Sequence, residues 1–153
     1  MHRVERSVLV PYTTGQMFAL VAAIRDYPTF LPWCASTQVR PRQDGRIDAT
    51  IDIHYRGVRS RFTTCNHNME PERIHMSLVD GPFRRLDGHW HFRWLRDDAC
   101  KVQFGLHYDF APGLLGRAIA PVFDGIATSL IDSFTRRAEA LYEPAGPLQG
   151  RIP

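Results

Sequence analysis

Histidines are the residues of this sequence best suited by type to metal binding or proton transfer. His89 and His91 stand two residues apart, so on a strand they would point to the same side, as two metal ligands can. Further histidines are scattered along the chain, at His54, His75 and His107. No further ligand stands at a spacing typical of a metal site. We therefore predict that these histidines lie on a solvated sheet face and that no metal is bound.

Nucleophilic and phosphate-transfer chemistry have no recognisable motif here. The chain contains neither a Gly-x-Ser-x-Gly elbow nor a Gly-rich phosphate loop. Its three cysteines, Cys34, Cys65 and Cys100, are odd in number and widely spaced, which argues against a disulfide framework or a structural zinc site. We predict buried or incidental thiols and a protein that is not an enzyme.

Positive charge is carried almost wholly by arginine. The net charge is +3, and Lys101 is the only lysine. Arginine is suited to phosphate and carboxylate recognition. Two interpretations stay open: a solvated polar face, or contact with RNA or an anionic surface, with no DNA partner predicted. The candidate contact residues are Arg59, Arg61, Arg84, Arg85 and Arg93.

The elements that must position these side chains are predicted to be mostly strands. From residue 36 to residue 110, apolar residues recur at every second position, which is typical of antiparallel strands with one buried face. Turn residues divide this region at 43–46, 55–58, 80–83 and 96–98. With a first strand over Val4–Val10, the pattern predicts about seven strands.

A short helix is predicted after the first strand. Thr13 and Gln16 form the pattern of a capping box, and the helix should end near residues 25–26. Two prolines then exclude a regular long helix over 27–34 and favour a turn or a one-turn helix. The apolar residues there, Phe30, Leu31 and Trp33, belong either to a pocket rim or to the core.

The longest periodic stretch runs from Gly113 to Tyr142. Apolar residues recur there at spacings of three and four, which predicts a long helix with a broad apolar stripe. Pro112 suits the first helical position. Pro121 cannot donate a backbone hydrogen bond, so a kink or break is expected near it.

This helix must cover the apolar face of the sheet, either as a solid plug or as one wall of a cavity for an apolar guest. Small residues such as Gly116, Gly125 and Ser129 would leave room or allow close packing. Tyr55, Tyr108 and Ser129 are candidates to orient a polar headgroup, and Leu114–Ile119 is a candidate movable gate. The predicted cavity lining is Phe30, Leu31, Trp33, Ile53, Tyr55, Phe62, Met76, Leu78, Trp90, Phe92, Trp94, Phe104, Leu106, Tyr108, Leu115, Ile119, Phe123, Ile126 and Leu130.

Six motifs in chain order resemble one protein family. They are Tyr27-Pro-x-Phe-Leu-Pro-Trp-Cys34, Arg61-Phe-Thr-Thr64, Ile74-His-Met-Ser-Leu-Val79, Gly81-Pro-Phe-Arg-Arg-Leu86, Gly88-x-Trp90-x-Phe92 and Pro121-Val-Phe123. Together they resemble the coenzyme Q-binding branch of the START-like (polyketide cyclase/dehydrase-like) superfamily, whose bacterial members are called ribosome association toxins (RatA). The resemblance covers residues 4 to 142.

The resemblance implies an α+β helix-grip fold (START-like, Bet v 1-like), in which a curved antiparallel sheet surrounds a long kinked C-terminal helix. It implies non-enzymatic binding of ubiquinone or a related polyprenyl lipid, in support of respiration or quinone biosynthesis. For the toxin-named members it implies instead binding to the large ribosomal subunit, which blocks its association with the small subunit. The motifs do not choose between these roles.

The sequence also allows predictions of domain boundaries and of cellular location. We predict one START-like domain over residues 1–143 and a flexible tail over 144–153, which is rich in proline and glycine. No signal peptide is recognised, and the most apolar run, Met17–Ile24, is too short to span a membrane. We therefore expect a cytoplasmic protein that visits the inner face of a membrane transiently. No cofactor is expected beyond the quinone or lipid as a bound ligand.

Overall fold

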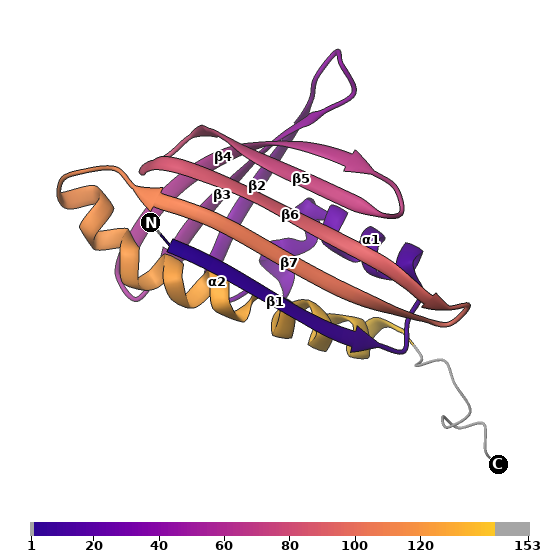
Figure 1. The fold of residues 1–153 in the computed structure, drawn as a ribbon. Coiled ribbons are helices and arrows are strands. Elements are labelled where there is room, and N and C mark those ends of the chain that lie inside the picture. Colours follow the sequence, from indigo (N-terminus) through magenta and orange to yellow (C-terminus); the bar gives the residue numbers. More distant parts are fainter. Residues whose placement is uncertain (1, 143–153) are drawn as a thin grey trace.

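The computed structural model describes residues 2–142 and contains one curved antiparallel sheet that wraps a long helix (Figure 1). The strand order is β1-β7-β6-β5-β4-β3-β2, so β1 and β2 form the two edges. The predicted α+β architecture, with about seven strands around a long C-terminal helix, is confirmed. The predicted tail lies outside the described residues. The elements are β1 (His2–Val10), α1 (Thr14–Ala22), the 3-10 helix η1 (Ile24–Thr29), β2 (Cys34–Pro41), β3 (Ile47–Tyr55), β4 (Val58–Met69), β5 (Arg73–Asp80), β6 (Phe83–Arg96), β7 (Ala99–Phe110) and α2 (Leu114–Leu141).

The N-terminus of α1 has the predicted capping box. The Gln16 amide donates to Thr13 Oγ1 over 3.0 Å, and the Thr13 amide donates to Gln16 Oε1 over 2.9 Å. The helix ends at Ala22, earlier than predicted, because the chain then tightens into η1. The Tyr27 hydroxyl donates to the carbonyl of Val21, which satisfies one of the acceptors left free at the end of α1. A short helix does form, but it ends at Thr29, so Phe30, Leu31 and Trp33, which the prediction placed on it, follow in an irregular segment.

The start of α2 differs from the prediction. Gly113 is the N-cap and has φ 107°, a backbone conformation that glycine adopts at little cost. Pro112 therefore precedes the cap and is not the first helical residue, as predicted. The helix is continuous from Leu114 to Leu141 with Pro121 inside it, so it is not broken there, and the alternative, a kink at Pro121, stays a prediction.

One stripe of α2 packs into the hollow of the sheet, against β1, β4 and β7. The buried residues of this stripe are Gly116, Ile119, Phe123, Ile126, Ala127, Ile131, Phe134 and Ala138. Among the described helices, α2 is the one whose length and apolar content would also allow it to cross a membrane; 33% of its most apolar segment is buried here. A helix that fills the concave face of a sheet passes the same test, so this feature fits a core helix.

Candidate functional site

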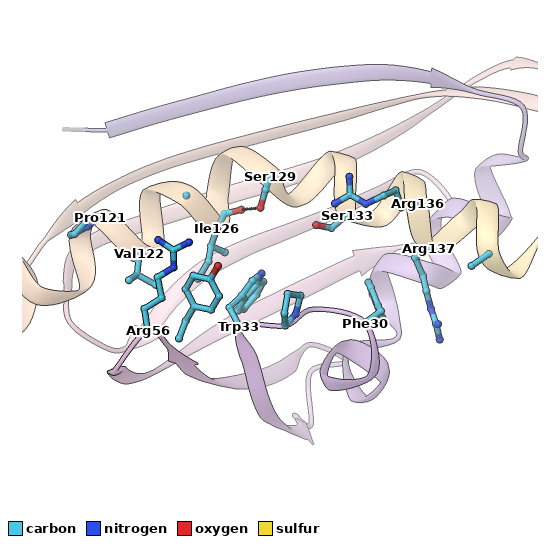
Figure 2. Close-up of a pocket in the computed structure, with 14 residues that line it drawn as sticks. Phe30, Trp33, Arg56, Pro121, Val122, Ile126, Ser129, Ser133, Arg136 and Arg137 are labelled. Carbon is cyan, nitrogen blue, oxygen red and sulfur yellow. Dashed lines mark hydrogen bonds between the residues drawn. The ribbon is translucent and has the colours of Figure 1, made fainter.

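A groove of about 770 Å³ runs along one side of α2, between the helix and the β2–β3–β4 end of the molecule. This volume lies within the usual range for small-molecule sites. In Figure 2 the α2 side chains Val122 and Ile126 lie opposite Trp33 and Arg56. The lining residues are Phe30, Pro32, Trp33, Tyr55, Arg56, Pro121, Val122, Gly125, Ile126, Ser129, Ser133, Arg136, Arg137 and Ala140.

The wall opposite α2 is built by two short connections. In the β3–β4 turn, Arg56 (φ 53°) and Gly57 (φ 80°) both adopt left-handed backbone conformations, which is typical of a two-residue hairpin. This turn places Tyr55 and Arg56 beside the helix. The segment after η1 is held by two backbone bonds: the His54 amide donates to the Trp33 carbonyl over 3.0 Å, and the Leu31 amide donates to the Tyr27 carbonyl over 2.9 Å.

A second, inner cavity lies between α2 and the sheet and measures only about 80 Å³. This is roughly half the size of an engineered ~150 Å³ core cavity that accepts benzene. Its walls are largely apolar but include a buried polar pair, in which Thr64 Oγ1 donates to Asn66 Oδ1 over 2.7 Å. Trp33 and Ile126 line both the groove and this cavity, so these two side chains separate them.

Trp33 carries the one buried side-chain polar atom that lacks a hydrogen-bond partner among residues 2–142, its indole Nε1. The residue is 7% exposed, and Figure 2 shows its indole turned toward α2 within the groove. A buried donor without an acceptor costs roughly 1–3 kcal/mol. This nitrogen is closed to solvent, so a ligand that supplied an oxygen acceptor would recover that cost only by displacing neighbouring side chains.

The predicted lining residues divide between four environments: the inner cavity, the groove, the packed core and the exposed surface. Those that line the inner cavity are Trp33, Phe62, Met76, Trp90, Phe104, Leu106, Phe123, Ile126 and Leu130. Those that line the groove are Phe30, Trp33, Tyr55 and Ile126. Those that pack in the core without reaching either space are Leu31, Ile53, Leu78, Phe92, Tyr108 and Ile119.

Two predicted lining residues, Trp94 and Leu115, are exposed, and their assignment is wrong. Trp94 keeps the inward alternation of Trp90 and Phe92, but it is 65% exposed, because it lies near the end of β6. Leu115 is 76% exposed, on the first turn of α2, where the buried stripe has not yet begun. The mobility predicted for Leu114–Ile119 stays a prediction.

Two of the three candidate headgroup contacts line the groove. Tyr55 and Ser129 do so, and the Ser129 hydroxyl donates to the carbonyl of Ile126 over 3.0 Å, which leaves its oxygen free to accept. Tyr108 instead donates to Asp124 Oδ1 over 2.6 Å and is buried in the core. Burial, reinforced by Asp124, raises the pKa of the Tyr108 phenol.

The prediction missed residues in both spaces. In the groove these are Pro32, Arg56, Pro121, Val122, Gly125, Ser133, Arg136, Arg137 and Ala140. In the inner cavity they are Ile24, Tyr27, Ala49, Ile51, Thr64, Asn66, Leu86, Ala127 and Phe134. Ala127 and Phe134 lie on the predicted helical stripe and could have been included. No pattern marked Arg136 or Arg137, because a charged residue on a helix is normally solvated.

The arginines predicted to contact RNA or an anionic surface lie outside the groove. Arg61 donates from Nε to Asp52 Oδ1 over 2.6 Å and from Nη2 to Oδ2 over 3.4 Å. Chiefly this hydrogen bond, with one from Ser36, lowers the pKa of Asp52. Arg84 lies 4.0 Å from Asp109. Arg59, Arg85 and Arg93 are exposed.

The histidines and cysteines form no reactive cluster in the described part of the chain. His75 contacts Asp87 over 3.0 Å, and no three His, Cys, Asp or Glu side chains among residues 2–142 are placed to hold a metal ion. All three cysteines are free and buried. Burial raises the pKa of Cys34 and of Cys100 to about 11, so both thiols stay protonated near neutral pH and are poor nucleophiles.

Comparison with known proteins defines the class first. Residues 10–135 match the family described as polyketide cyclase / dehydrase and lipid transport. A START superfamily protein from Mycobacterium smegmatis has the same fold, with a TM-score of 0.77, 20% identity and coverage of 93% of this chain and 100% of that one. An 18 kDa protein from Caulobacter crescentus is 34% identical, with a TM-score of 0.70 and coverage of 92% and 98%. The predicted helix-grip fold is thereby confirmed.

Named relatives narrow the branch. The ribosome association toxin RatA of Escherichia coli K12 is 37% identical over 142 residues, which cover 93% of this chain and 90% of that protein. The persistence and stress-resistance toxin PasT of E. coli O6:H1 is 38% identical with the same coverage. A coenzyme Q-binding protein COQ10 homolog B of Xenopus laevis is 23% identical over 140 residues, which cover 89% of this chain and 57% of that protein. The chain therefore belongs to the START-like polyketide cyclase/dehydrase family, and it is more similar to the proteins named PasT and RatA than to the COQ10 homolog.

Proposed function

We propose that this protein binds a hydrophobic ligand without changing it chemically, and that the ligand is ubiquinone or a related polyprenyl lipid. The protein would act as a carrier or chaperone in respiration or quinone biosynthesis, with no cofactor of its own. The observation that supports this most directly is the groove with Trp33 in its wall, where a buried indole N–H has no acceptor.

Binding would depend on apolar burial and on few polar contacts. Each Å² of apolar surface removed from water contributes about 25 cal/mol. The groove offers apolar walls from Phe30, Val122 and Ile126 for an isoprenoid tail. A quinone carbonyl can accept from Trp33 Nε1 or from the Tyr55 hydroxyl, which would orient the ring.

The inner cavity would limit how deeply the ligand enters. At about 80 Å³ it is too small for a substituted quinone ring, so the ring stays in the groove unless Trp33 and Ile126 move apart. Deeper entry would also bring the ring toward Thr64 and Asn66, whose polar groups could contact a carbonyl.

The test uses the purified full chain in two measurements. Organic extraction followed by mass spectrometry should release a quinone or prenyl lipid, and titration with decylubiquinone should quench tryptophan fluorescence saturably. Trp33→Phe keeps an aromatic wall but removes the N–H, so it should weaken decylubiquinone binding about tenfold. Trp94→Phe, at an exposed indole, is the matched control and should bind as the parent does. The proposal fails if extraction releases no lipid and decylubiquinone causes no saturable quenching.

A second function is favoured by sequence similarity: association with the large ribosomal subunit, which would block subunit joining. Its support is the 37% identity to a protein named ribosome association toxin over 142 residues. The exposed arginines Arg84 and Arg85 would then contact rRNA phosphates. Co-sedimentation with large subunits should weaken steeply with salt and be lost on charge reversal at these two positions. Absent or salt-insensitive co-sedimentation contradicts it.

A cytoplasmic carrier of a lipid must also meet a membrane, and one end of the molecule suits a transient contact. Leu114 and Leu115 are 80% and 76% exposed. The Ala111 amide donates to the carbonyl of Pro82 over 2.9 Å, which brings the arginine pair at 84–85 to the same end. Flotation with vesicles containing anionic lipid should therefore weaken when both leucines are replaced by serine. Unchanged flotation would place the contact elsewhere.

A further inference from the structure

The groove combines an apolar floor with a wholly positive rim. Three arginines line it, Arg56 from the β3–β4 turn and Arg136 and Arg137 from α2, and in the part of the chain that the structure describes no aspartate or glutamate lines it. None of the three forms an ion pair with a residue in the described range 2–142. This differs from the outer surface, where Arg42, Arg61 and Arg96 each contact an aspartate within 3 Å.

Two of these guanidinium groups are held in place by aromatic rings. The Arg137 guanidinium carbon lies 4.8 Å from the centre of the Phe30 ring, and that of Arg56 lies 5.2 Å from the centre of the Tyr55 ring. A guanidinium that stacks on a ring keeps its N–H donors free at the edge. Phe30 and Tyr55 are themselves lining residues, so these donors are available beside the groove.

Positive charge beside an apolar surface without counter-charge is unfavourable in the empty protein. Clefts lined by one sign of charge, with walls of low dielectric constant, concentrate the opposite charge. The acidic residues around the rim are Asp26, which shares a small side hollow with Phe30 and Arg137, and Asp132 and Glu139, which lie one turn from Arg136 on α2. None of them forms an ion pair with these arginines. A ligand that brings both an apolar tail and an anionic group would satisfy the floor and the rim together.

We propose that the ligand of this groove is an anionic amphiphile, an apolar chain that carries one phosphate or carboxylate group. Figure 2 shows Arg56 near Val122 at one end of the groove and Arg136 and Arg137 at the other, so we place the anion beside the two adjacent arginines, while Arg56 adds positive charge to the opposite end of the rim. This inference rests on the proposed lipid-binding function and narrows its ligand class, because a quinone has no charge. Ser133 lies on the same wall and adds a hydroxyl group that can donate to the anion. An RNA phosphate backbone suits the groove less well, because it could contact the arginines of the rim but would leave the apolar floor between them uncovered.

The test compares probes that share a ten-carbon chain: decyl phosphate, decanoate, decanol and decylubiquinone, with inorganic phosphate as the headgroup alone. Isothermal titration calorimetry of the full chain at pH 8 and low salt measures each dissociation constant. Decyl phosphate and decanoate should bind at least tenfold more tightly than decanol. The comparison of the two anionic probes distinguishes a phosphate headgroup from a carboxylate. Inorganic phosphate should bind far more weakly than decyl phosphate.

The matched variants carry the same change in net charge. Arg56→Gln, Arg136→Gln and Arg137→Gln, combined, should reduce the affinity for decyl phosphate to that for decanol and leave decanol binding within twofold. The control combines Arg25→Gln, Arg40→Gln and Arg73→Gln, which are exposed and do not line the groove. It should retain the preference for the anion. Far-ultraviolet circular dichroism and thermal unfolding check that both triple variants are folded.

Each outcome decides between the two proposals. If decylubiquinone binds but decyl phosphate binds no better than decanol, the anion proposal fails while the lipid function stands. The anion proposal is also overturned if the control variant loses as much affinity for decyl phosphate as the groove variant does. The same holds if inorganic phosphate binds as tightly as decyl phosphate. If the anionic probes bind and decylubiquinone does not, the quinone assignment fails and the anion proposal stands. If no probe binds, both fail.

Discussion

The inner cavity and the groove lie on either side of Trp33 and Ile126, yet they differ in almost every physical respect. The inner cavity is small, about 80 Å³, and its walls are aromatic and aliphatic side chains with one buried polar pair. The groove is about ten times larger, opens to solvent and has three arginines on its rim. The interior has the density of a packed core, whereas the groove has the shape and charge of a binding site.

The ring contacts explain why the interior is nearly full. Phe123 of α2 lies 4.7 Å from Phe83 and 4.9 Å from Tyr108, measured between ring centroids. Trp90 lies 4.5 Å from Phe104 and 5.4 Å from Phe134. Mutually perpendicular and tilted rings of this kind fill space efficiently. The large number of aromatic residues therefore contributes mainly to packing, and the space for a ligand lies beside the helix.

Removing a ring from the interior should give the largest effect. Phe134→Ala deletes a side chain that is 2% exposed and contacts Tyr27, Phe30 and Trp90. The free energy of unfolding, measured by urea denaturation, should fall by about 3–5 kcal/mol, because both burial and packing are lost. Trp94→Ala, at an exposed ring, should change it by less than about 1 kcal/mol. A comparable loss in both variants would mean that the interior is not a packed core.

Alkaline pH should destabilise the interior through its buried thiols. Burial raises the pKa of Cys34 and of Cys100 from 9.0 to about 11, so the unfolded chain releases these protons first as pH rises. Their contribution to stability is complete below pH 9 and is lost as pH rises toward 11. The expected loss between pH 8 and pH 10.5 is roughly 2 kcal/mol for each thiol. Urea midpoints at pH 8, 9, 10 and 10.5 measure it, and Cys100→Ala should make the decline shallower. A flat profile would contradict the assigned burial.

Two glycines of α2 should respond in opposite directions. A Cβ at Gly116 would lie 2.0 Å from the carbonyl oxygen of Ala111, whereas a Cβ at Gly125 meets nothing within 4 Å. Gly125→Ala should raise the free energy of unfolding by about 0.5–1 kcal/mol, because alanine favours the helix. Gly116→Ala should lower it. Thermal unfolding compares the two, and a stabilised Gly116→Ala would refute the close contact. Gly125→Leu should in addition reduce decylubiquinone binding, because it fills the groove.

The smallest effect is expected on the outer face. Arg61→Gln breaks the exposed ion pair with Asp52, and such pairs contribute less than about 1 kcal/mol. Urea denaturation should detect a change no larger than this. Binding of groove ligands should be unchanged, since Arg61 does not line the groove. An altered affinity for groove ligands would show that the outer sheet face and the groove are coupled and do not act independently.

Local sequence patterns predicted the elements well where local physics governs them. Three such features depend only on residues close in the chain. They are the capping box of Thr13 and Gln16, the two-residue turn at Arg56–Gly57, and the period of two in β3 that buries both Ala49 and Ile53. The same patterns failed at boundaries. Gly113, not Pro112, determines where α2 begins, and Trp94 follows the inward alternation although its end of β6 leaves it exposed.

The sequence by itself determined an apolar sheet face, a long apolar helix and therefore a helix enclosed by a sheet, because periodicity dictates which side chains must leave water. Only the tertiary structure decided that the small residues Gly116 and Gly125 serve different purposes, one for close packing and one beside open space. It also brought Arg56 to the same groove as Arg136 and Arg137, across eighty residues of chain. The reason is that a binding site is formed by elements distant in sequence, and the charge of its rim has no local pattern.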